Sequence, residues 1–73
     1  MTLPERKKLL GERVRDLRLA RGWSFKTAAD ACQLNERVYW GVDAAKNFPS
    51  VPTLLKICEG LNATPDYLLG FDE

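Results

Sequence analysis

Residues 35–45, NERVYWGVDAA, place three different recognition groups close together in the sequence. The Glu36 carboxylate accepts hydrogen bonds, and the Arg37 guanidinium donates them from a planar fork. Trp40 adds a large flat apolar surface with a single N–H donor. Side chains of these kinds hold another molecule by hydrogen bonds and apolar contact, so the segment suggests a binding surface.

A binding surface of this kind needs a helix that is anchored on its other side. Projected as a helix, residues 36–44 carry Val38, Tyr39 and Val42 on one side. We expect this side to be buried, with the Tyr39 ring inside and its hydroxyl reaching an edge. The other side, expected to be free, carries Glu36, Arg37, Trp40, Gly41 and Ala44.

The groups that enzymes and metal sites use most often are missing from the sequence. There is no histidine, which removes the commonest general base and the commonest metal ligand. Cys32 and Cys58 are too few for a zinc site or a disulfide framework, and their apolar neighbours predict that both lie in the core. No nucleophile stands beside a base, and no glycine loop could cradle a phosphate. We therefore expect no enzyme, no cofactor and no metal.

Size and composition are those of one small globular domain. The chain has 73 residues, of which 45% are hydrophobic and 29% charged. No apolar run is long enough to cross a membrane, and residues 1–8 do not resemble a signal peptide. We expect a cytoplasmic protein with no membrane association.

Charge is distributed unevenly along the chain although the net charge is only +1. Residues 1–26 hold eight Lys/Arg and three Asp/Glu, whereas residues 27–73 hold three Lys/Arg and seven Asp/Glu. A basic half next to an acidic half suggests one face suited to a polyanion. Arg6, Lys7 and Lys8 alone are expected to form a solvated helix end.

Capping residues predict five helices and no strand. Ser, Thr or Asn precedes each expected helix, and spacing such as Leu10, Val14, Leu17 gives the first helix an apolar side. The expected helices run over residues 3–21, 25–32, 36–44, 51–61 and 65–70. The sequence thus predicts an all-α fold in a single domain, residues 1–73.

Two stretches, LGERVRDLRLARGWS and PSVPTLLKICEGLNATPDYLLG, carry a resemblance that spans residues 10–70 without a gap. They resemble the helix-turn-helix domain of the lambda-repressor and Cro type, also called the xenobiotic-response-element class. The resemblance implies a compact five-helix DNA-binding domain with its helix-turn-helix at about residues 24–44. It further implies a sequence-specific transcriptional regulator, a repressor, that binds double-stranded DNA as a homodimer on a near-palindromic operator.

The resemblance also implies roles for individual residues. Base-reading residues would be Glu36, Arg37, Trp40 and Gly41. Positions beside the DNA phosphates would be Phe25, Lys26, Lys46 and Asn47. The dimer interface would comprise Asn62, Ala63, Thr64, Pro65, Tyr67 and Leu68. A structural ion pair would join Arg18 to Asp43.

The helix-turn-helix segment departs from the family pattern in three respects. Phe25 stands where such domains typically have a glutamine that binds a phosphate, which phenylalanine cannot do. Gly41 lies in mid-helix, where glycine costs about 1 kcal/mol relative to alanine. Residues 24–46 hold three Lys/Arg and three Asp/Glu, which predicts weak binding to DNA by a monomer.

These departures leave three interpretations of Trp40. It could contact thymine methyl groups in the major groove while Arg37 binds guanine and Glu36 binds cytosine. It could form an exposed aromatic patch with Phe25 that docks a protein partner or a second copy. It could also fold back over its own helix. The alternative to DNA binding is therefore a helix-turn-helix scaffold used for protein–protein interaction.

Overall fold

The computed structural model describes residues 1–72, and this part of the chain contains five helices and no strand. The helices are α1 (Leu3–Ala20), α2 (Phe25–Ala31), α3 (Glu36–Asp43), α4 (Val51–Leu61) and α5 (Pro65–Leu69). The predicted all-α class and the start of every helix are confirmed. Four of the five helices end one residue earlier than expected.

Each helix starts at a side chain that caps its first turn. The caps are Thr2, Ser24, Asn35, Ser50 and Thr64. In α3 the Asn35 side-chain oxygen accepts from the Val38 N–H at 2.8 Å, which satisfies one of the amides that the first turn leaves without a partner. These short polar side chains explain why the sequence predicted the helix starts well.

A residue with left-handed backbone follows each helix, directly after α4 and α5 and two positions after the last residue of α1, α2 and α3. The residues are Gly22, Gln33, Ala45, Asn62 and Gly70. In all five cases the next residue donates its amide to the carbonyl five positions earlier, at 2.8–3.1 Å. Gln33 and Ala45 adopt φ of 56° and 58° with a side chain that disfavours this conformation. Helix ends at such residues depend on the surrounding structure, so a search of the sequence for glycine does not find them.

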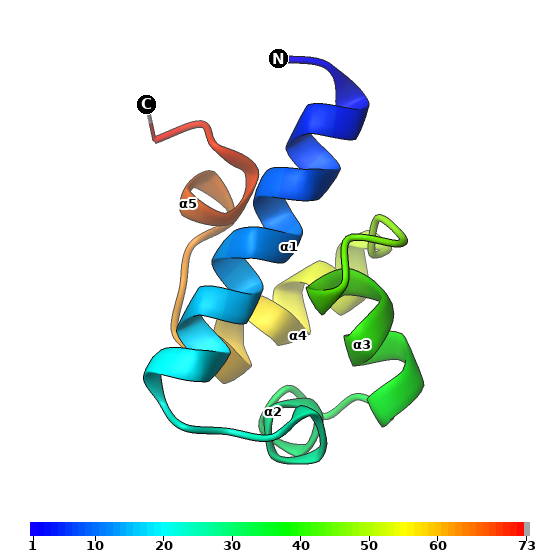
Figure 1. The fold of residues 1–73 in the computed structure, drawn as a ribbon, viewed down its shortest axis with the longest axis vertical. Coiled ribbons are helices and arrows are strands. Elements are labelled where there is room, and N and C mark those ends of the chain that lie inside the picture. Colours follow the sequence, from blue (N-terminus) through cyan, green and yellow to red (C-terminus); the bar gives the residue numbers. More distant parts are fainter. Residues whose placement is uncertain (73) are drawn as a thin grey trace.

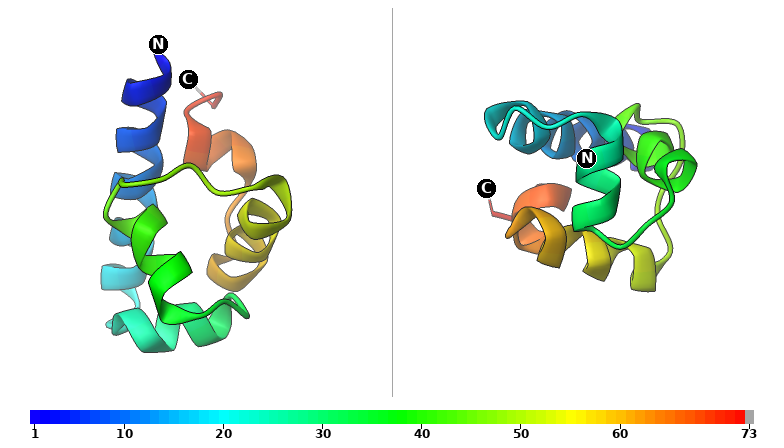
Figure 2. Two further views of the ribbon diagram at one scale, coloured as in Figure 1. Left: turned by 90° about the vertical axis from the view of Figure 1, so that its right-hand side faces the viewer. Right: turned by 90° about the horizontal axis from the view of Figure 1, so that it is seen from below.

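The helices surround α1, the longest element (Figure 1). α5 packs along the N-terminal half of α1, and α3 and α4 contact α1 further along. α2 lies at the opposite end of the molecule from both termini and bridges α3 and α4 (Figures 1 and 2). The largest fully buried side chains, which form the core between these helices, are Tyr39, Leu10, Ile57, Leu61, Leu68, Val14 and Cys32.

Cys32 and Cys58 are both buried free thiols, as the sequence predicted. Burial raises the pKa of the Cys32 thiol to about 11, so it stays protonated and behaves as a small apolar group.

Gly60 lets α4 approach the end of α2. A Cβ on Gly60 would lie 2.7 Å from Cys32 Cα and 2.8 Å from the Ala31 carbonyl oxygen. Both are backbone atoms, which cannot move without shifting α2. A side chain at position 60 would therefore push α2 and α4 apart.

We expect Gly60→Ala to lower the free energy of unfolding by about 1–3 kcal/mol, because the overlap outweighs the helix propensity that alanine gains. Thermal and urea unfolding followed by circular dichroism measure the change. Glu59→Ala, at the exposed neighbouring position, is the matched control. A Gly60→Ala protein as stable as the wild type would contradict this close packing.

Candidate nucleic-acid interface

α2 and α3 form a helix-turn-helix joined by residues 32–35. They pack against each other, and the buried face of α2 presents the small residues Ala28 and Ala29. Figure 2 shows α3 at one side of the molecule with its outer face uncovered by other helices. The turn therefore packs the two helices against each other and leaves the outer face of α3 uncovered.

The exposed residues of α3 are Glu36, Arg37, Val38 and Trp40. The Trp40 side chain is 43% exposed. Glu36 and Arg37 have no side-chain hydrogen bond or ion pair within residues 1–72, so both are available to a ligand. An acid, a base and an aromatic ring are thus presented together.

Two residues of α3 do not lie where the helical projection placed them. Val38, expected in the core, is 41% exposed because the buried side is centred on Tyr39 and Asp43 and Val38 lies beyond its edge. Gly41, expected on the free side as a base-reading residue, is buried. Asp43 completes the buried side in place of Val38.

Gly41 is buried near the side chain of Asn47 and not near a core residue. A Cβ on Gly41 would lie 2.8 Å from Asn47 Nδ2. The Gly41 carbonyl accepts from the Lys46 amide at 2.9 Å and from the Asn47 amide at 3.1 Å. The chain after α3 therefore folds back, and the Asn47 carboxamide lies over the outer face of the helix.

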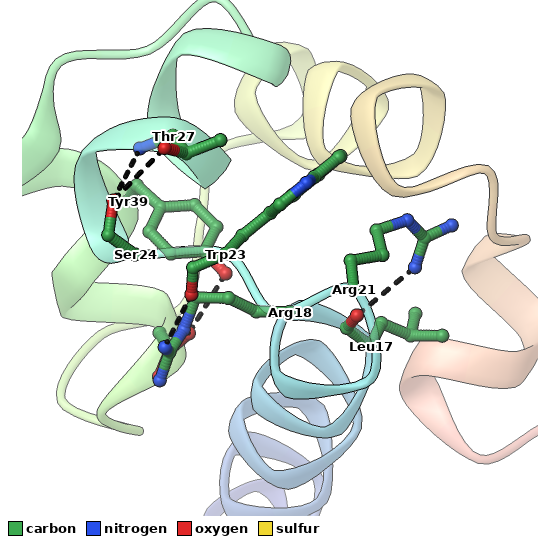
Figure 3. Close-up of polar contacts among 8 residues, drawn as sticks. Leu17, Arg18, Arg21, Trp23, Ser24, Thr27 and Tyr39 are labelled. Atoms are coloured by element: carbon green, nitrogen blue, oxygen red, sulfur yellow. Dashed lines mark hydrogen bonds and ion pairs between the residues drawn. The ribbon is translucent and has the colours of Figure 1, made fainter.

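The inner side of α3 is tied to α1 by a buried polar network (Figure 3). Arg18 Nε donates to Asp43 Oδ2 at 2.8 Å, and the Tyr39 hydroxyl donates to the same oxygen at 2.9 Å. Arg18 Nη1 also donates to the Trp23 carbonyl at 3.1 Å. The Tyr39 hydroxyl was expected at an edge, but Asp43 gives it an acceptor inside the protein.

Contacts within this network favour the charged form of Arg18 and the protonated form of Tyr39. The hydrogen bond from Arg18 to Asp43 raises the pKa of the guanidinium, which stays charged. Burial, and then the hydrogen bond to Asp43, raise the pKa of Tyr39, so its hydroxyl remains a donor. The network thus keeps the Arg18 charge and the Tyr39 hydroxyl donor.

Phe25 is half-buried and does not form an exposed patch with Trp40. The Arg18 guanidinium lies over the Phe25 ring, 4.2 Å from its centroid. The ring therefore belongs to the packing around the buried network. This corrects the expectation of an exposed Phe25 that forms a patch with Trp40. Its place beside the phosphates stays a prediction.

The exposed side chains of residues 24–46 carry a net charge that differs from the formal net charge of zero for this segment. Asp43 is paired with Arg18 from α1, which lies outside this segment. The exposed charges that remain are three bases, Lys26, Arg37 and Lys46, and two acids, Asp30 and Glu36, a balance of +1. Lys26 and Asp30 are 3.4 Å apart in an exposed pair, which solvent screens strongly. The surface is weakly basic.

Arginines of the basic N-terminal half bind the acidic half of the same chain. Arg6 Nη1 donates to the Leu69 carbonyl at 2.6 Å, and Arg21 Nη2 donates to the Leu61 carbonyl at 2.6 Å. These carbonyls end α5 and α4, where the helix dipole favours a cation. Figure 3 shows Arg21 leaving α1 in a different direction from Arg18, away from Tyr39. The expected solvated helix end is therefore wrong at Arg6, whereas a face suited to a polyanion on the basic half stays a prediction.

The C-terminal segment predicted as a dimer interface is only partly available. Leu68 is 0% exposed and cannot contact a partner, because its side chain completes the core. Tyr67 is half-buried beneath Arg13, whose guanidinium lies 4.5 Å from the ring centroid and also pairs with Asp72 at 2.8 Å. Asn62, Thr64 and Pro65 are exposed, Ala63 is half-buried like Tyr67, and all five stay predicted interface positions.

No group of three or more Cys, Asp or Glu side chains in residues 1–72 could hold a metal ion. None of the helices in this range combines the length and the hydropathy that a membrane span needs.

Comparison with known proteins gives one match. A family model described as a helix-turn-helix domain matches residues 9–68, which include all of α2, α3 and α4. Neither the curated proteins nor the solved structures yielded a significant match.

We expect Asp43→Ala to destabilise the protein by about 3–5 kcal/mol, because it leaves the Arg18 charge and the Tyr39 hydroxyl buried without their shared acceptor. Asp43→Asn keeps an acceptor and should cost less. Urea unfolding measures both changes, and Asp30→Ala removes an acid from an exposed pair as the control. Equal unfolding midpoints for Asp43→Ala and Asp30→Ala would contradict a structural role for the network.

Proposed function

The chain belongs to the helix-turn-helix domain family, and from that membership we propose that it is a sequence-specific DNA-binding transcriptional regulator. The observation that carries the proposal is the two-sided character of α3. Tyr39 and Asp43 anchor its inner side, whereas Arg37 and Trp40 are exposed on its outer side. A helix of this kind can enter the major groove without losing contacts to its own domain.

The outer side of α3 offers distinct chemistry to bases. Arg37 can donate two hydrogen bonds to guanine O6 and N7, and Glu36 can accept from the amino group of cytosine. Trp40 can contact a thymine methyl group. Lys26 and Lys46, exposed at either end of the helix-turn-helix, are suited to phosphate contacts that set its position on the duplex.

Weak basicity favours binding as a dimer. An exposed balance of +1 on the helix-turn-helix supplies little phosphate neutralisation per copy. Two copies on a near-palindromic operator, with half-sites about 34 Å apart, would double these contacts. Asn62, Thr64 and Pro65 are exposed on the turn into α5 and could meet their counterparts across a two-fold axis. Where such an operator overlaps a promoter, its occupation would repress transcription.

The scaffold alternative has lost one half of its proposed surface. It required Phe25 and Trp40 together, but Arg18 covers the Phe25 ring and only Trp40 remains exposed. Protein binding through Trp40 alone stays an outcome that the following experiment can detect.

Selection from random duplexes at low salt should enrich a near-palindromic site. We expect Arg37→Ala to lose the preference at one base position per half-site, because one bidentate contact is removed, at about 1–3 kcal/mol of discrimination. Sequencing of the selected pools measures the preference. Lys26→Ala is the charge-matched control and should weaken all sequences alike while reducing the salt slope of binding by about 1.

The salt dependence separates the two functions. Binding to DNA should weaken linearly in log salt, because phosphate neutralisation releases counterions. No enrichment at low salt, together with Trp40 fluorescence that changes only with protein concentration, would exclude the regulator and leave self-association through Trp40.

A further inference from the structure

Asn47 carries a carboxamide that the fold does not use. The residue is exposed, and its side chain has no hydrogen-bond partner within residues 1–72. The side-chain carboxamide nevertheless lies in a defined place, with Nδ2 against the outer face of α3 at Gly41. A donor and an acceptor are therefore held together beside the helix without satisfying any group of the protein.

The backbone after α3 holds Asn47 in this position. Ala45 adopts left-handed backbone with φ of 58°, which reverses the chain. The Lys46 and Asn47 amides then both donate to the Gly41 carbonyl, at 2.9 and 3.1 Å. Residue 47 is thus attached to the turn of α3 that contains Gly41 and does not move freely with the loop.

Gly41 has no side chain on the outer face of α3, and the side chain of Asn47 lies in the space that this leaves. Position 41 follows Arg37 by four residues, so the two lie on the same side of α3, about 6 Å apart along its axis. A side chain on residue 41 would occupy the space of the Asn47 amide, since its Cβ would lie 2.8 Å from Nδ2. The glycine and the asparagine therefore form one unit next to Arg37.

On the basis of the proposed function, we propose that Asn47 is a specificity-determining residue that binds an adenine base, in the place a side chain at position 41 would take, beside the base bound by Arg37. A carboxamide donates and accepts in parallel, which matches N7 and the N6 amino group of adenine in the major groove. A phosphate only accepts and would use the donor alone. The sequence predicted that Asn47 lies beside a phosphate. Its position on the outer face of α3 favours contact with a base over contact with a phosphate.

The proposal assigns Gly41 a role that differs from that of Gly60. The Cβ of Gly41→Ala would meet the end of a flexible side chain, whereas that of Gly60→Ala would meet backbone. Gly41→Ala should therefore fold well, with a helix more stable than in the wild type. It should also displace the Asn47 amide, which makes it a stable variant that tests recognition alone.

The experiment is selection from random duplexes with the wild type, Asn47→Ala, Gly41→Ala and the double variant. We expect one adenine position, adjacent to the guanine assigned by Arg37→Ala, to lose roughly tenfold or more of its preference in Asn47→Ala. Gly41→Ala should lose the same position, and the double variant should be no worse than either single one. Without DNA, the side-chain amide resonances of Asn47 should shift in Gly41→Ala, and thermal melts should establish that each variant is folded.

The outcomes separate this proposal from the one on which it rests. An enriched site whose base preferences all survive Asn47→Ala, with uniform weakening like that of Lys46→Ala, assigns Asn47 to a phosphate and overturns the inference alone. Loss of different positions in Asn47→Ala and Gly41→Ala also overturns it. No enriched site for the wild type overturns both proposals.

Discussion

The buried interaction of Arg18 with Asp43 is the constraint on which the rest of the structure depends. Asp43 accepts from Arg18 at both carboxylate oxygens and from the Tyr39 hydroxyl at Oδ2, so α1 and both turns of α3 meet at one carboxylate. Arg18 in addition donates to the chain leaving α1 and covers the Phe25 ring at the start of α2. One side chain thus fixes the mutual position of three helices. The directional hydrogen bonds of this pair restrict how the three helices can be placed relative to one another.

Contacts of arginine within the chain also explain why a count of charges along the sequence does not predict the charge that the surface presents. Arg6, Arg13 and Arg21 stack on aromatic rings and donate to carbonyls of the C-terminal segment, so they neutralise helix ends of their own chain. Arginine suits this task because its planar guanidinium can stack and donate at once. The exposed side chains of the helix-turn-helix therefore carry only a weak positive charge.

The sequence predicted those features that depend on neighbouring residues. Caps such as Ser24 and Asn35 act within one turn, so the helix starts were predicted correctly. Features that depend on contacts across the fold were not. Ala45 ends α3 without a glycine signal, Leu68 lies in the core although a dimer role was expected, and Val38 lies outside it. The fold of Asn47 over Gly41 was equally invisible, because nothing in either residue type indicates that the loop returns to the helix.

Both ends of the described chain lie on the side of the domain away from α2 (Figure 1). Arg6 stacks on Phe71 at 3.9 Å and Arg13 pairs with Asp72, so the two ends are also held to each other. A polypeptide fused at either end would therefore emerge away from α2 and need not cross it. Tandem copies joined end to end by a flexible linker are thus a practical design, in which linker length would control how far apart two copies can sit.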